Sequence, residues 1–154
     1  MNNKKRILFL CTTNSCRSQM AEGIVKHLYS KQFEVASAGS KVTPVHPLAI
    51  KVMAEIGIDI SNQRSKLVTE FFGQEFDYVI TLCGGYSKTA CPVFLGKAKQ
   101  ESHWDFIDPA EAKGDEEERL KVFRKVRDEI KNKLVEFIEQ LNKNPDEPTT
   151  QSAE

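Results

Sequence analysis

A continuous apolar run over residues 7–10 stops at Cys11, and from Ser18 onward apolar residues recur at three- and four-residue spacing. The first pattern is typical of a strand that is buried on both faces, and the second is typical of an amphipathic helix. Strands buried in this way occur mainly in parallel sheets with helices packed on them. The start of the chain therefore predicts a strand, loop and helix unit of an α/β domain.

The alternation of strand and helix patterns continues along the chain. We expect a second strand over residues 33–39, and a helix from Pro47, which favours a first helical turn, to Gly57, which suits the position after a helix end. Ser65 is in place to cap a short helix that precedes a third strand over residues 77–82. These elements extend the parallel α/β pattern.

The last third of the chain predicts a loop, a short strand and a long helix. Residues 84–100 contain Gly, Ser and Pro without a regular period, which indicates a loop, and a fourth strand is expected over residues 103–106. Asp115 resembles the cap of a long helix whose apolar stripe extends to Leu141. This stripe is expected to pack in the core.

Together these elements predict an α/β fold with three layers: a four-stranded parallel sheet with helices on both faces. The 154 residues, 40% of them hydrophobic, suffice for one core. We expect a single catalytic domain over residues 1–142 and a disordered tail over residues 143–154, which lacks apolar residues.

Composition limits the partners of this domain. Lys+Arg and Asp+Glu both number 22, so no net charge favours nucleic acid or an anionic membrane. The N-terminal apolar run is too short for a signal peptide or a membrane span. We therefore expect a cytoplasmic protein, and we assign it as a monomer. In the cytoplasm, the four cysteines are expected to be reduced, catalytic or metal-binding rather than structural disulfides.

The loop CTTNSCRS joins the first strand to the first helix. Backbone N–H groups in a tight loop at a helix N-terminus can converge on one point, where the helix dipole also favours an anion. Arg17 adds a planar fork that pairs with a tetrahedral oxyanion. This environment favours the nucleophilic thiolate of Cys11, and Ser18 is placed to donate a hydrogen bond to it. The residues assigned to oxyanion binding are Thr12, Thr13, Asn14, Ser15, Cys16 and Arg17.

Three reactive side chains follow predicted strands: Cys11, Cys83 and Asp108. Ligands of open parallel sheets bind beyond the carboxyl ends of the strands, so one end of the sheet can gather all three. Asp108 suits a general acid, although aspartate before proline is also a common turn residue. Cys83 has a second interpretation as a small buried residue at a strand end, and Cys16 is expected to face the core.

Several longer motifs resemble the arsenate reductases that are built on the low-molecular-weight tyrosine phosphatase fold. The motifs are CTTNSCRSQMAEG, SAG, GIDISNQRS, VITLC, HWDFIDPAEAKGDEEE and FRKVRDEI, within residues 6–141. The resemblance implies that Cys11 attacks arsenate and that Asp108 protonates the leaving oxygen. It also implies that Arg17 and Ser18 bind the oxyanion and stabilise the thiolate.

The same resemblance implies a relay of cysteines. Cys83 attacks the Cys11 sulfur of the arsenic adduct, which releases arsenite and forms a Cys11–Cys83 disulfide. Cys91 then attacks Cys83 and carries the disulfide to thioredoxin. The implied partners are arsenate, with phosphate or sulfate as analogues, and thioredoxin, which supplies the reducing equivalents without a bound cofactor. Such an enzyme serves arsenical resistance.

Some members of that family bind potassium beside the loop, through residues that match Asn14, Glu22, Ser37 and an aspartate. In this chain the aspartate position holds Lys66. We hypothesise that the Lys66 ammonium replaces the potassium ion near Glu22, which would make the enzyme independent of potassium. No metal site is expected.

Two other functions stay open on the sequence. A low-molecular-weight tyrosine phosphatase has the same kind of loop, but it usually carries a tyrosine at the position of Ala110. A non-catalytic protein could bind a metal ion or arsenite through Cys11, Cys16, Cys83 and Cys91, although their spacing does not favour zinc. The electron donor is also open between thioredoxin, glutaredoxin with glutathione, and another small thiol.

Overall fold

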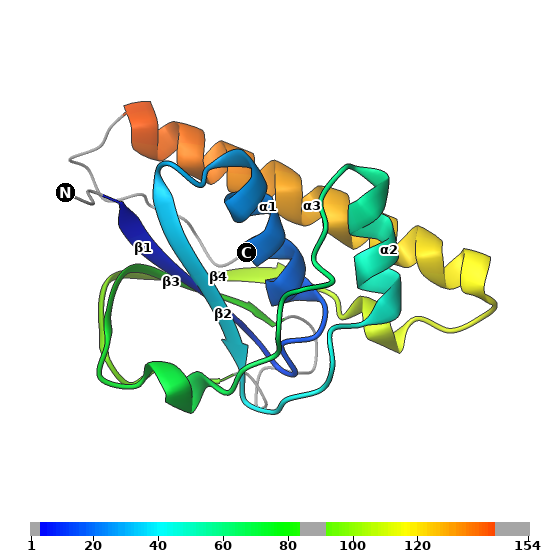
Figure 1. The fold of residues 1–154 in the computed structure, drawn as a ribbon, viewed down its shortest axis with the longest axis horizontal. Helices are drawn as coiled ribbons and strands as arrows, with labels where there is room; N and C mark the ends of the chain where they lie inside the picture. Colours follow the sequence, from blue (N-terminus) through cyan, green and yellow to red (C-terminus); the bar gives the residue numbers. More distant parts are fainter. Residues whose placement is uncertain (1–3, 84–91, 144–154) are drawn as a thin grey trace.

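The computed structural model describes residues 4–83 and 92–143. Four strands form one parallel sheet in the order β2-β1-β3-β4 (Figure 1). The strands are β1 (Lys5–Cys11), β2 (Phe33–Gly39), β3 (Glu75–Cys83) and β4 (Lys97–Phe106). The helices are α1 (Arg17–Leu28), α2 (Pro47–Glu55) and α3 (Glu116–Lys143), with the 3₁₀ helices η1 (Val68–Phe71) and η3 (Pro109–Glu111). The predicted α/β class and the four-stranded parallel sheet are confirmed.

Alternate residues of β1 face opposite sides of the sheet and lie in two separate cores. Ile7 and Phe9 pack in the larger core with the buried residues of α1, α2 and α3 (Figure 1). Leu8 and Leu10 pack in the smaller core, which includes Val68 of η1 and Phe94. Helical elements therefore lie on both faces as predicted, but they are unequal: three α-helices cover one face, and the 3₁₀ helix η1 is part of the cover of the other.

The fourth strand is longer than the sequence predicted. Residues 97–100 belong to β4 and not to a loop, so that part of the loop prediction over residues 84–100 was wrong. Among the described strands, β4 lies at the edge of the sheet and pairs with β3, and many of its side chains contact solvent. An edge strand of this kind does not need the continuous apolar run that marks β1. The polar sequence at the start of β4 therefore gave no strand pattern that could be recognised.

Two predicted helix boundaries had different outcomes. α2 begins at Pro47, and Gly57 has a φ of 81°, the left-handed conformation expected after a helix end. Ser65 does not cap a helix, because η1 begins only at Val68 and the Ser65 hydroxyl instead donates to the carbonyl of Asn14 at 2.8 Å. The Ser65 prediction was wrong because this partner lies far away in the sequence, where a local pattern cannot show it.

The long helix α3 begins after Asp115, whose carboxylate accepts the backbone N–H of Glu118 at 2.9 Å, as the sequence predicted. Its buried residues follow the predicted stripe from Leu120 to Leu141 and pack in the larger core. No helix within residues 4–83 and 92–143 is long and apolar enough to cross a membrane.

Candidate active site

The loop from Cys11 to Arg17, which we call the oxyanion cradle, joins β1 to α1 at the carboxyl end of the sheet. The side chains of Cys11 and Arg17 are both buried. Cys83 ends β3 and Asp108 follows β4. Thr12 Oγ1 lies 3.8 Å from Cys83 Sγ, and Arg17 Nη2 lies 3.8 Å from Asp108 Oδ2. The structure therefore gathers Cys11, Arg17, Cys83 and Asp108 at one end of the sheet.

The carbonyl groups of residues 12–15 all accept hydrogen bonds from donors outside the cradle. The donors are the backbone N–H groups of Ser40, Lys41, Thr43 and His46, the hydroxyl of Ser65 and the side-chain amide of Gln19, at distances from 2.8 to 3.3 Å. In a planar trans peptide, the C=O and the following N–H point in opposite directions. These outer donors therefore turn the N–H groups of residues 13–16 toward the inner side of the loop, as oxyanion binding requires.

Asn14 connects the cradle to the sulfur of Cys11. Its φ of 52° is left-handed, and its Oδ1 accepts the backbone N–H of Lys66 at 2.8 Å, which fixes the orientation of the amide. Nδ2 then donates to Ser18 Oγ at 2.7 Å and to Ser37 Oγ at 2.9 Å. Because Ser18 accepts this bond, its own proton is available to Cys11 Sγ, 2.8 Å away. The Ser18 hydroxyl is therefore oriented to donate a hydrogen bond to the Cys11 sulfur.

A buried carboxylate extends the same network. Ser37 donates to Glu22 Oε1 at 2.5 Å, and the ammonium of Lys66 lies 3.6 Å from the same oxygen. Lys66 also donates to the carbonyl of Arg64 at 2.8 Å, and Lys26 pairs with the other oxygen of Glu22 at 2.5 Å. Burial lowers the pKa of Lys66, and the Glu22 carboxylate acts in the opposite direction. The structure thus brings Glu22, Ser37 and Lys66 together behind the cradle.

Arg17 is held by the ends of two strands. Its Nη1 donates to the carbonyl of Phe106 at 3.0 Å and to that of Leu82 at 3.3 Å, and the residue is 1% exposed. Its Nε is buried and has no hydrogen-bond partner within the described part of the chain. An unpaired buried donor is costly, typically about 1–3 kcal/mol, unless a ligand satisfies it. This free donor beside the cradle is suited to an oxyanion.

The cysteines have different surroundings. Cys11 and Cys16 are free, and Cys83 is disulfide-bonded, while Cys91 lies outside the described residues. Burial raises the pKa of Cys16 to about 12, and its side chain belongs to the larger core. Cys16 therefore stays protonated at neutral pH and faces the core, as the sequence predicted. In the described ranges, no three His, Cys, Asp or Glu side chains form a group that could hold a metal ion.

Among the residues that support the cradle, Gln19, Gln63 and Gly39 were not singled out from the sequence. Gln19 Nε2 donates to both oxygens of Asn14 at 3.0 Å, and Gln63 donates to Gln19 Oε1 at 2.7 Å. A Cβ atom at Gly39 would lie 2.8 Å from backbone atoms of the cradle, so only glycine lets β2 approach it this closely. Of the three, only Gly39 had a local signal, as a glycine at the end of a predicted strand.

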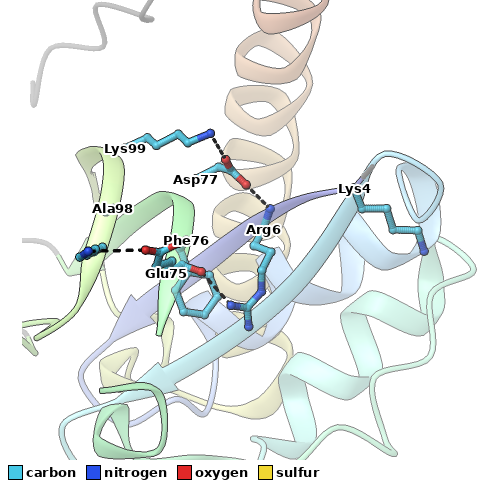
Figure 2. A pocket seen from close by; sticks show the side chains of 8 residues that line it. Lys4, Arg6, Glu75, Phe76, Asp77, Ala98 and Lys99 are labelled. Atoms are coloured by element: carbon cyan, nitrogen blue, oxygen red, sulfur yellow. Dashed lines mark hydrogen bonds and ion pairs between the residues drawn. The ribbon is translucent and has the colours of Figure 1, made fainter. Parts of the chain in front are cut away.

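A separate hollow of about 380 Å³ opens at the other end of the sheet, where β1, β3 and β4 begin (Figure 2). It is lined by Lys4, Arg6, Glu75, Phe76, Asp77, Lys97, Ala98 and Lys99. Figure 2 shows the carboxylate of Asp77 between Lys99 and Arg6. The ammonium of Lys99 lies 3.1 Å from Asp77 Oδ1, and the backbone N–H of Arg6 donates to Asp77 Oδ2 at 2.7 Å. The Arg6 guanidinium lies over the Phe76 ring at 4.3 Å. These contacts stabilise the end of the sheet at which β1, β3 and β4 begin. None of the predicted site residues lines the hollow.

Asp77 allows a test of stability at this end of the sheet. Burial would raise the pKa of Asp77, but the Arg6 N–H and the Lys99 ammonium lower it overall. A carboxylate with a lowered pKa stabilises the fold above its unfolded-state pKa, and this contribution is lost as pH falls through the folded-state pKa. We expect Asp77→Asn to lower the free energy of unfolding by about 1 kcal/mol at neutral pH, and by progressively less at acidic pH.

Thermal unfolding of both proteins over a series of pH values measures this difference. Glu101→Gln, which removes an exposed carboxylate from β4, is the matched control and should have little effect at any pH. A cost of Asp77→Asn that does not change with pH would contradict the expected role of the charge.

The fold and the cradle define a class of protein. The chain belongs to the low molecular weight phosphotyrosine protein phosphatase family, whose model matches residues 6–147. It is 50% identical over 137 residues to the arsenate reductase of Shouchella clausii, in an alignment that covers 89% of this chain and 97% of that protein.

Solved structures agree with this assignment. An arsenate reductase in the phosphate binding state has a TM-score of 0.73 and 37% identity, covering 88% of this chain and 98% of the other. The thioredoxin-dependent arsenate reductase of Corynebacterium glutamicum has a TM-score of 0.63 and 28% identity, covering 90% of this chain and 62% of the other. The predicted resemblance to arsenate reductases on the low-molecular-weight phosphatase fold is confirmed.

Proposed function

We propose that this protein is an arsenate reductase that works by thiol–disulfide exchange and receives electrons from thioredoxin. The observation that carries the proposal is the position of Cys83, whose sulfur lies 3.8 Å from the hydroxyl of Thr12, the residue after Cys11. A phosphatase needs a cradle, a nucleophile and water, whereas a reductase also needs a second sulfur within reach. The similarity to proteins named arsenate reductase supports the same activity.

In the first step, the Cys11 thiolate attacks the arsenic atom of bound arsenate. A bond forms between sulfur and arsenic, and one arsenate oxygen leaves as water after it takes a proton from Asp108. Arg17 and the inward N–H groups of the cradle balance the negative charge of the remaining oxygens. Arsenic is still As(V) in this adduct.

In the second step, the thiolate of reduced Cys83 attacks the Cys11 sulfur. An S–S bond forms, the electron pair of the S–As bond passes to arsenic, and As(III) leaves as arsenite. Cys91 then attacks Cys83 and frees Cys11 for the next cycle. Thioredoxin reduces the remaining disulfide, so two thiols are oxidised for each arsenate that is reduced.

The proposal is tested by arsenite formation from arsenate with thioredoxin, thioredoxin reductase and NADPH. We expect continuous turnover only when all components are present, with equal amounts of arsenite formed and NADPH consumed. Hydrolysis of an aryl phosphate without arsenite formation would favour a phosphatase instead. Turnover with glutaredoxin and glutathione, but not with thioredoxin, would replace the proposed electron donor.

Lys66 leads to a prediction about ions. We expect equal rates of arsenate reduction in sodium and potassium buffers of equal ionic strength, because the Lys66 ammonium already supplies a positive charge 3.6 Å from Glu22. Lys66→Gln should lower kcat/KM by about tenfold, since it removes a partner of a buried carboxylate. Lys26→Gln is the matched control: Lys26 also pairs with Glu22, but it is largely exposed and should matter less. A strong potassium requirement of the unmodified protein would contradict this role.

A further inference from the structure

His46 links the oxyanion cradle to the first turn of α2. Its backbone N–H donates to the carbonyl of Ser15 at 3.0 Å, and its Nδ1 accepts the backbone N–H of Leu48 at 3.1 Å. The imidazole is thus the N-cap of α2. Because Nδ1 must be an acceptor, this contact requires the neutral tautomer with its proton on Nε2.

The surroundings of His46 favour this neutral form. The ring of Phe123 in α3 packs against the imidazole, with 4.8 Å between the ring centroids. Burial and the Arg119 guanidinium of α3 lower the pKa of His46, and the Asp108 carboxylate partly opposes them. The N-terminus of α2, with its partial positive charge, also disfavours a cation at this position.

The cap is coupled to the cradle through one peptide plane. The carbonyl of Ser15 and the N–H of Cys16 belong to the same peptide group, so the donor that holds the carbonyl outward also directs this N–H inward. That donor is the backbone N–H of His46. We propose that His46 is a positioning residue for the oxyanion cradle, and that it holds this peptide plane only while its imidazole is neutral.

Protonation of His46 at Nδ1 removes the acceptor of the Leu48 N–H, which is the hydrogen bond that caps α2. A proton on Nδ1 would face the N–H of Leu48, so the imidazole must leave its place at the start of α2. Residues 40–46, whose backbone N–H groups donate three further hydrogen bonds to the carbonyls of Thr12 and Thr13, lose their anchor at the α2 end. The cradle then binds an oxyanion less tightly.

A direct electrostatic effect acts in the opposite direction, because a cationic imidazole attracts an oxyanion. Salt weakens this attraction between partly exposed charges, while a short hydrogen bond between backbone groups is little affected. At about 0.15 M salt, we therefore expect the loss of the cap to dominate. This inference rests on the proposed function of the cradle, and its test separates the two.

Inorganic sulfate is a suitable probe because it keeps both negative charges over the range in which histidine titrates. Its affinity would be measured by calorimetry from about pH 5 to about pH 8, in a Cys11→Ser background that removes the titration of the nucleophile. We expect the affinity to fall by about three- to tenfold as the pH decreases. Because linkage is reciprocal, sulfate should also lower the pKa of His46 as measured by NMR.

Three variants in the same background complete the test. His46→Asn retains an oxygen acceptor that does not titrate, and its affinity should stay near the high-pH value throughout. His46→Ala lacks the acceptor and should bind weakly at every pH. His27→Asn, which changes an exposed histidine at the end of α1, should keep the parent's pH profile.

The outcomes are distinct. A pH dependence in His46→Asn equal to that of the parent would overturn the proposal, as would tighter binding of sulfate by the parent at low pH or an increase in the pKa of His46 on adding sulfate. Absence of sulfate binding by the parent at every pH would overturn the cradle itself and the inference built on it.

Discussion

Replacing Cys83 by serine is expected to abolish arsenite formation, with a loss of at least about a thousandfold in kcat/KM, the order of loss seen when a reacting nucleophile is removed. A serine oxygen does not attack the Cys11 sulfur to form a disulfide, so the reaction stops at the arsenic adduct. Hydrolysis of an aryl phosphate should continue nearly unchanged, because the hydrogen bonds that orient the cradle come from α1 and from residues 40–46 and 63–66.

Both activities would be measured on the same preparations, and the product bound to the protein would be identified by mass spectrometry after rapid quenching. Cys91→Ser is the informative comparison, because it should release one equivalent of arsenite and then stop, whereas Cys83→Ser should release none. Sustained arsenite formation by Cys83→Ser would show that another group displaces arsenite, and the relay would then be wrong.

The meeting of Cys11, Cys83 and Asp108 could be predicted because each follows a strand pattern, and the strands are parallel. A parallel sheet places all its carboxyl ends at one edge, so the position of a residue relative to its own strand is sufficient. The prediction survived an incorrect start for β4, because only the end of that strand, at Phe106, determines where Asp108 lies.

The outer supports of the cradle could not be predicted in the same way. Gln63, Ser65 and His46 reach the cradle from segments that lie far away in the sequence. Their contacts depend on the packing of α2 against α3 and on the hydrogen bonds of residues 63–66 to α1 and to the cradle. The sequence around Ser65 suggested that it caps a helix, but its hydroxyl instead donates to the distant carbonyl of Asn14. Hydrogen bonds of this kind follow from tertiary structure, and a local pattern does not contain them.

Arg17→Lys is expected to lower both sulfate affinity and kcat/KM for arsenate by about a hundred- to a thousandfold. Lysine keeps the positive charge, so the loss measures the planar fork alone. In the structure, Nη1 is used by the carbonyls of Phe106 and Leu82, while Nε is buried without a partner in the described ranges. A single ammonium group cannot bind those carbonyls and also present the remaining donors to an oxyanion.

A control is needed because Arg17 also ties the ends of β3 and β4 together. Arg127→Lys is the matched variant: Arg127 is 8% exposed and donates to the carbonyl of Val52 at 2.9 Å and to Glu55, away from the cradle. Both variants should unfold at lower temperature, but only Arg17→Lys should lose sulfate affinity. A buried guanidinium that binds the oxyanion cannot be replaced by an ammonium without loss of sulfate affinity. If the two variants bind sulfate equally well, the Arg17 guanidinium therefore supports the fold and does not bind the oxyanion.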